Sequence, residues 1–139
     1  MIVFTPPTAP EGLSDIIRNH SPSYPAILAV YLFGSYSTGK AKPGSDLDLA
    51  ILLQPDQEDD FPMLELTVSL EKALGRRVDL VILNRAGELL KYQVRRNGCL
   101  LYERDPRLRK QFEVRGRKSF EDFLYLHRLY LSRTFHRSA

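Results

Sequence analysis

The sequence predicts an α/β fold, in which a small mixed sheet with flanking helices is followed by a long C-terminal helix. Two observations lead to this prediction. Apolar runs typical of strands alternate with segments of helical periodicity up to about residue 103, and one helical pattern continues from Asp105. In addition, 139 residues with 43% apolar content are enough for one compact domain with a single core.

The first half of the chain predicts one helix and two strands. In the segment EGLSDIIRNH the apolar residues have helical spacing, and the segment SPSYP then breaks the helix. The run AILAVYLF, residues 26–33, is rich in β-favouring residues and ends at Gly34, so it predicts a strand. The run DLDLAILL, residues 46–53, predicts the second strand.

The chain up to residue 103 predicts two more helices, each followed by a strand. The segment FPMLELTVSLEKALG, residues 61–75, places its apolar residues along one side of a helix that a terminal glycine can end. RRVDLVIL, residues 76–83, predicts the third strand. Residues 87–97 predict a helix, and CLLYE, residues 99–103, predicts a short fourth strand.

A long helix is predicted after Asp105, which can cap it, with Pro106 in the first helical position. Large residues recur on one side of this helix at 3.6-residue periodicity, namely Leu108, Phe112, Phe120, Phe123, His127 and Tyr130. Other apolar residues between positions 123 and 131 surround so much of the circumference that the sheet alone cannot bury them all. We therefore expect one side of the helix to pack on the core. The other side is expected to dock a protein partner or a second copy, giving a hetero-oligomer or a homo-oligomer.

The distribution of charge excludes some classes of protein and leaves others open. Residues 1–103 carry 10 Lys and Arg against 13 Asp and Glu, whereas residues 104–139 carry 10 against 4. The basic end can face solvent, an acidic protein or nucleic acid, and direct nucleic-acid binding is the least favoured of the three. The single cysteine, Cys99, cannot form an intrachain disulfide, and no apolar run approaches the length of a membrane span. With no basic leader at the N-terminus, these features predict a cytoplasmic protein without membrane contact.

The chemistry of the chain is concentrated in residues 32–53, LFGSYSTGKAKPGSDLDLAILL. A glycine-serine pair, Gly34 and Ser35, ends one strand, and Asp46 and Asp48 begin the next. Because side chains alternate along a strand, both carboxylates point to one face, about 6–7 Å apart at the backbone. Two anions this close repel each other unless protons or cations compensate them, and Mg²⁺ accepts one or two carboxylates together with water and phosphate oxygens.

A third carboxylate, Asp79, stands in the third strand between two apolar residues. If the second and third strands are neighbours, Asp79 completes a three-carboxylate cluster. Three acids can hold two divalent ions about 3.5–4 Å apart, an arrangement that serves phosphoryl and nucleotidyl transfer. The glycine at the end of the first strand lets backbone amides approach a phosphate, and the loop that follows carries Lys40 and Lys42.

These residues resemble the signature of the nucleotidyltransferase superfamily of polymerase β type. That signature is a glycine-serine pair, a spacer of about this length, Asp-x-Asp, and a third acid on a later strand. The matching residues are Gly34, Ser35, Asp46, Asp48 and Asp79. The resemblance covers residues 26–103, which it implies to be the catalytic core of a single nucleotidyltransferase domain at 1–139, with a C-terminal helical extension at 105–136.

The resemblance also implies roles for the site residues. Asp46 and Asp48 would bind two Mg²⁺ ions, and Asp79 would bind the ion on the side of the nucleophile and help deprotonate it. Gly34 and Ser35 would hold the β- and γ-phosphates of ATP, the substrate. The chain is thus expected to be a Mg²⁺-dependent enzyme.

The size and layout of the chain resemble the minimal nucleotidyltransferase (MNT) antitoxins, which act beside helical HEPN ribonuclease toxins. This resemblance implies an antitoxin that transfers AMP from ATP to a tyrosine hydroxyl of its HEPN-type toxin protein and so neutralises it. One alternative is transfer of a nucleotide to a small hydroxylated molecule such as an aminoglycoside. Another is a non-catalytic antitoxin that inhibits by binding alone.

Overall fold

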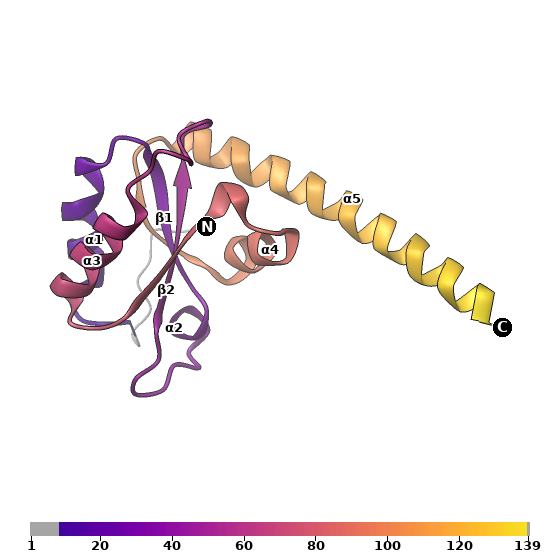
Figure 1. Cartoon of the computed structure of the whole chain (residues 1–139), viewed down its shortest axis with the longest axis horizontal. Helices are drawn as coiled ribbons and strands as arrows, with labels where there is room; N and C mark the ends of the chain where they lie inside the picture. Colours follow the sequence, from indigo (N-terminus) through magenta and orange to yellow (C-terminus); the bar gives the residue numbers. More distant parts are fainter. Residues whose placement is uncertain (1–8, 139) are drawn as a thin grey trace.

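The computed structural model describes residues 9–138 of the chain and consists of one four-stranded sheet with helices on both faces (Figure 1). The sheet has the order β3-β2-β1-β4, with strands β1 (Ile27–Phe33), β2 (Leu47–Leu53), β3 (Val78–Ile82) and β4 (Cys99–Glu103). Strand β1 pairs antiparallel with β2 and β4, and β2 pairs parallel with β3. The predicted mixed sheet with flanking helices and a long C-terminal helix is therefore confirmed.

The helices are α1 (Leu13–His20), α2 (Ser35–Thr38), α3 (Met63–Leu74), α4 (Glu88–Asn97) and α5 (Pro106–Ser138), with short 3₁₀ turns at Ser21–Ser23 and Leu83–Arg85. Helices α1 and α3 cover one face of the sheet, and α4 covers the other together with the start of α5 (Figure 1). Strands β1 and β2 are buried on both faces, which explains their continuous apolar runs. The core therefore consists of two apolar layers separated by the sheet.

Most boundaries predicted from the sequence agree with the structure to within one or two residues. One difference is α2, because the segment after Gly34 was expected to be a loop and forms a short helix. A second difference is Asp46, which was expected inside a strand and instead lies one residue before β2. Cys99 is buried, and its burial raises the pKa of the thiol.

The beginning of α5 is fixed to the sheet by a cap and a buried ion network. Asp105 accepts a hydrogen bond from the amide of Leu108 through Oδ1 at 3.1 Å, which confirms the predicted cap. Arg109 is only 5% exposed, and its guanidinium donates to Glu103 at 2.5 Å and to Glu113 at 2.9 Å. The hydroxyl of Tyr31 on β1 donates to the same Glu113 oxygen at 3.0 Å.

Beyond this network α5 crosses α4 and then leaves the body of the protein (Figure 1). The rings of Phe120 on α5 and Tyr92 on α4 stack with centroids 4.4 Å apart, and Phe123 and His127 continue the row of stacked rings. Tyr130, which by periodicity lies on the same side of the helix as Phe123, is 66% exposed because α5 has left the body of the protein at that point. In the described residues no helix is both long enough and apolar enough to span a membrane.

Candidate active site

Gly34, Asp48 and Asp79 lie side by side at one end of the sheet. Phe33, the last residue of β1, pairs with Asp48 near the start of β2, and Asp48 pairs with Asp79 on β3. Because β2 and β3 are parallel and paired in this register, the two carboxylates project from the same face of strands about 4.8 Å apart. The condition set by the sequence, that the second and third strands are neighbours, is met.

The third predicted carboxylate, Asp46, is exposed, as is Asp79, whereas Asp48 is half-buried. Burial raises the pKa of Asp48 above its ordinary value, and the negative charges of Asp79 and Asp46 raise that pKa further. Both neighbours therefore act electrostatically on Asp48. Asp48 and Asp79 are paired on neighbouring strands, and the charge of Asp46 also acts on Asp48, so we call the three aspartates the anionic group, which a bound cation or a proton would stabilise.

Gly34 makes the closest approach of the backbone to this group. Its φ of 72° and ψ of −149° belong to a region that only glycine adopts readily. A Cβ atom built on Gly34 would stand 2.1 Å from Oδ2 of Asp48, so a side chain there would collide with the carboxylate. The sequence predicts a glycine that lets the backbone approach a phosphate, and the structure adds a second reason, its contact with Asp48.

Ser35 is half-buried and is the first residue of α2. Hydrogen bonds to the carbonyl group of Gly34, just before the helix, hold its first turn. The amides of Ser37 and Thr38 donate to the carbonyl oxygen of Gly34 at 3.1 and 3.2 Å. The next segment leads to Asp46 and carries Lys40 and Lys42, both exposed. Two cationic side chains thus belong to the loop that connects the glycine-serine turn with the carboxylates.

Two residues that sequence reasoning missed connect the parts of this site. Tyr36 on α2 is buried, and its hydroxyl accepts a hydrogen bond of 2.5 Å from Nη1 of Arg76, just before β3. The guanidinium carbon of Arg76 also lies 5.5 Å from the centre of the tyrosine ring. The tyrosine hydroxyl is 3.5 Å from the carbonyl oxygen of Ser45, the residue before Asp46. The sequence around Arg76 gives no signal of this contact, because the contact depends on tertiary structure.

The donor set of the anionic group suits a hard divalent cation. Within residues 9–138, no group of three or more His, Cys, Asp and Glu side chains is arranged so that it could hold a metal ion by itself. Mg²⁺ does not need such a group, because it binds through one or two carboxylates and takes its remaining ligands from water and substrate phosphates. Oxygen donors, a half-buried carboxylate with a raised pKa and nearby negative charges are therefore compatible with an ion that is bound together with a nucleotide.

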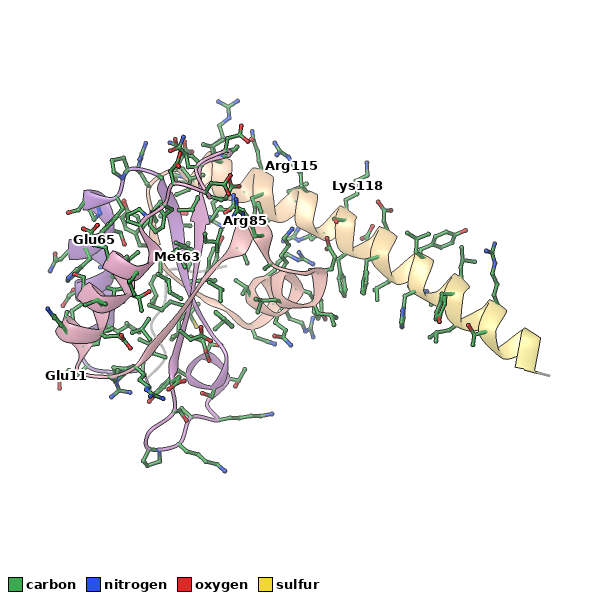
Figure 2. The ribbon with its side chains drawn as sticks, in the orientation of Figure 1. Glu11, Met63, Glu65, Arg85, Arg115 and Lys118 are labelled. Atoms are coloured by element: carbon green, nitrogen blue, oxygen red, sulfur yellow. The ribbon has the colours of Figure 1, made fainter. Side chains whose placement is uncertain are left out.

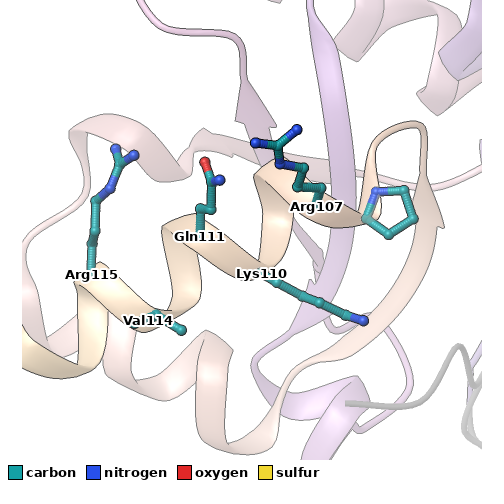
Figure 3. Close-up of a pocket in the computed structure, with 6 residues that line it drawn as sticks. Arg107, Lys110, Gln111, Val114 and Arg115 are labelled. Carbon is teal, nitrogen blue, oxygen red and sulfur yellow. The ribbon is translucent and has the colours of Figure 1, made fainter.

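A broad hollow of about 660 Å³ lies on the first turns of α5, away from the carboxylates. Its lining comes from one helix, with Arg107, Gln111 and Arg115 extending to one side and Lys110 to the other (Figure 3). Glu103, just before this helix, pairs with Ala29 near the start of β1, whereas Asp48 pairs at the end of β1. The hollow is thus at the opposite end of the sheet from the candidate active site.

Comparison with known families decides which kind of protein carries this site. The family model described as "Polymerase beta, Nucleotidyltransferase" matches residues 14–107, which include all four strands and each of the predicted site residues. The chain belongs to this family. The resemblance inferred from Gly34, Ser35 and the three aspartates is therefore confirmed at the level of the family.

The relatives of this nucleotidyltransferase include toxin-antitoxin proteins. It is 39% identical over 87 residues to the protein adenylyltransferase MntA of Shewanella oneidensis, and the aligned part is 63% of this chain and 62% of that relative. A chain from a crystal structure of a toxin-antitoxin with AMP-PNP is 28% identical, with a TM-score of 0.70 over 88% of this chain and 95% of that chain. A chain from a structure of a tri-AMPylated Shewanella oneidensis HEPN toxin in complex with MNT antitoxin is 28% identical, with a TM-score of 0.67. The match covers 88% of this chain and 97% of the chain from that structure.

Proposed function

We propose that this nucleotidyltransferase is an antitoxin that transfers AMP from ATP to a tyrosine hydroxyl of a HEPN-type toxin and thereby neutralises it. The observation that carries the proposal is the pairing of Asp48 with Asp79 beside the Gly34 turn, in a chain of the polymerase β nucleotidyltransferase family. The names of its relatives, a protein adenylyltransferase and toxin-antitoxin complexes, support a protein as the acceptor.

In the proposed reaction the tyrosine oxygen attacks the α-phosphorus of ATP in line with the bond to the β-phosphate. A new bond forms between the tyrosine oxygen and the α-phosphorus, and pyrophosphate leaves with the electrons of the broken bond. The free phenol has a pKa near 10, so its proton must be accepted as the attack proceeds. We assign that task to Asp79, which is exposed at the edge of the anionic group, and we assign the β- and γ-phosphates to Gly34 and Ser35.

We assign the binding of Mg²⁺ to Asp46 and Asp48, with Asp79 as the third ligand, and two ions are expected. The ions would supply positive charge against the phosphate oxygens, which bare carboxylates would repel. The raised pKa of Asp48 supports this assignment, because a carboxylate that gains from a nearby cation is held at an electrostatic cost without one.

The proposal extends to the organisation and location of the chain. We interpret residues 1–139 as a single nucleotidyltransferase domain, with the catalytic core at 26–103 and the helical extension at 105–136. A cytoplasmic location is proposed because the reaction consumes ATP and the chain carries one buried thiol and no disulfide.

The test uses a helical HEPN partner encoded by an adjacent gene, mixed with the full chain, Mg²⁺ and ATP labelled in either the α- or the γ-phosphate. Label from the α-phosphate is expected on the partner, and label from the γ-phosphate is expected only in pyrophosphate. Asp46→Asn should lower the rate of labelling by at least about 10²-fold, because one of the ligands of the activating charge is lost.

The same experiment separates the alternatives. If the partner is inhibited without acquiring label, the chain acts by binding alone and the proposed transfer is wrong. If label accumulates on an aminoglycoside added to the mixture and not on the partner, the acceptor is a small molecule. If Asp46→Asn labels the partner at the rate of the wild type, the carboxylate group is not the catalytic site.

A further inference from the structure

The outer half of α5 exposes large apolar side chains that nothing in the structure covers. Leu126 is 63% exposed, Leu129 37% and Tyr130 66%, although each is large enough to belong to a core. Side chains stand out from this part of the helix, and no other element lies beside it (Figure 2). Phe120, which stacks on Tyr92 of α4, lies several residues earlier along the helix.

These three residues lie on one side of the helix, and that side carries a charged residue before them and another after them. At 100° per residue, positions 122, 126, 129, 130 and 133 fall on the same side, which faces away from Phe120 and is bordered by Phe123 next to Tyr130. We call this set, Asp122, Leu126, Leu129, Tyr130 and Arg133, the α5 stripe. Within the described part of the chain, neither Asp122 nor Arg133 makes an ion pair.

The α5 stripe is complementary to itself when two copies run in opposite directions. An antiparallel pair that places Asp122 opposite Arg133 of the second copy also places Leu126 opposite Leu129, since both pairs of positions have the same midpoint. Two-fold symmetry then repeats each contact, as in an isologous dimer. A parallel pair would instead place Asp122 against Asp122 and Arg133 against Arg133, which is repulsive.

The projection of α5 makes such a pairing sterically accessible. The helix continues beyond the body of the protein, with its C-terminal end free of other elements (Figure 1). In an antiparallel pair centred between residues 127 and 128, the two folded bodies lie at opposite ends of the paired helices. The carboxylate group is at the end of the sheet opposite to the start of α5, and none of its residues belongs to the α5 stripe.

We propose that the α5 stripe is a self-association surface, through which two copies of this chain form an antiparallel helix pair. The apolar side chains carry the affinity, and the pair of opposite charges at each end selects the antiparallel direction. Because a single pair of helices is small compared with a standard protein interface, the dimer is expected to be reversible and not obligate.

The test is a charge exchange in the full chain, followed by sedimentation velocity from about 1 to about 100 μM protein without any partner. The wild type should change from monomer to dimer over this range. Asp122→Arg and Arg133→Asp should each weaken the dimer at least tenfold, and the double variant should restore it, because the exchanged charges again face each other. Leu126→Lys should abolish the dimer, and circular dichroism verifies that each variant keeps its helix content.

Arg128→Asp is the matched control, because it makes the same change of charge in the same segment but on the opposite side of the helix. It should leave the dissociation constant within about twofold of the wild type. A wild type that stays monomeric at the highest concentration would overturn the proposal, as would equal effects of Arg128→Asp and Arg133→Asp. If the stripe variants instead weaken only the complex with a HEPN toxin, the surface belongs to the toxin and the self-association proposal is wrong.

Discussion

At the scale of single residues, the backbone at Gly34 and the carboxylate of Asp48 constrain each other. The positive φ of Gly34 allows the turn into α2, and the missing side chain leaves room for Oδ2 of Asp48. Gly39 at the other end of α2 also has a positive φ, of 76°, but no atom lies within 4 Å of a Cβ built there. The two glycines therefore share a conformational requirement and differ in what they contact.

This difference predicts distinct effects for Gly34→Ala and Gly39→Ala. Gly39→Ala should lose about 1–2 kcal/mol of unfolding free energy, because alanine is strained in the left-handed region. Gly34→Ala should lose more, because its φ and ψ suit glycine alone and the new Cβ would collide with Asp48. Only Gly34→Ala should lower the rate of AMP transfer, by about 10²-fold, since it displaces Asp48 and a shift of ~1 Å has that cost. Urea denaturation and the labelling assay measure the two quantities. Equal loss of transfer in both variants would mean that α2 as a whole is the sensitive feature.

The raised pKa of Asp48 gives a defined dependence of stability on pH. In the folded protein Asp48 holds its proton up to a higher pH than in the unfolded chain, because of burial and of the charges of Asp79 and Asp46. Between the unfolded and the folded pKa the native state binds more protons, so this carboxyl group makes the protein less stable as the pH rises through that interval. At neutral pH the ionised Asp48 is therefore a net cost to the metal-free fold.

At the scale of secondary-structure elements, α5 depends on the buried cation of Arg109. Its guanidinium donates to Glu103 on β4 and to Glu113 on α5, and Glu113 also accepts from Tyr31. Burial raises the pKa of Tyr31, and the nearby charge of Glu113 raises it further, so Tyr31 remains a hydrogen-bond donor. The network joins the first turns of α5 to two neighbouring strands.

Arg109→Met should lower the free energy of unfolding by about 3–5 kcal/mol, because it leaves two carboxylates near the sheet without their cation. Arg107→Met is the control, since Arg107 is exposed on the same turn of the helix and its loss should change stability by about 0.5 kcal/mol or less. Urea denaturation followed by circular dichroism measures both. Similar midpoints for the two variants would show that the network does not stabilise the attachment of α5.

The elements themselves could be predicted because each has a local signal. Helix α3 has an apolar side and ends at Gly75, and α5 begins with Asp105 and Pro106, while β1 and β2 are continuous apolar runs. Helix α2 has no such signal, because SYST consists of small and polar residues that are equally common in loops. It forms because Tyr36 is buried and held by Arg76, contacts that depend on the fold.

The residues of the candidate site could be predicted because they lie in or next to strands that the sequence predicts. The alternation of side chains along β2 and the position of Asp79 in an apolar run indicated which carboxylates belong to the site. Whether the carboxylates meet depends on the order β3-β2-β1-β4 and on the register of Asp48 with Asp79, and neither is encoded locally. The exposure of Tyr130 could not be predicted either, because helical periodicity does not indicate where a helix leaves the body of the protein.

At the scale of the whole molecule, the two ends of the sheet have separate tasks. One end carries the glycine-serine turn and the three aspartates, and the other anchors a helix that projects away from the body (Figure 1). We propose that these carboxylates are kept together for transfer of AMP and not for stability of the fold.

The most direct test of this claim measures both properties on the same preparations of wild type and Asp48→Asn. Intact-mass spectrometry follows the gain of AMP on a tyrosine of the HEPN partner after incubation with ATP and Mg²⁺, and thermal unfolding in EDTA follows stability. The account predicts that Asp48→Asn transfers almost no AMP yet unfolds about 1–3 °C higher than the wild type at neutral pH, a small rise because solvent screens part of the repulsion. Undiminished AMP transfer by Asp48→Asn would contradict the account, and a variant that loses both transfer and stability would show that Asp48 supports the fold.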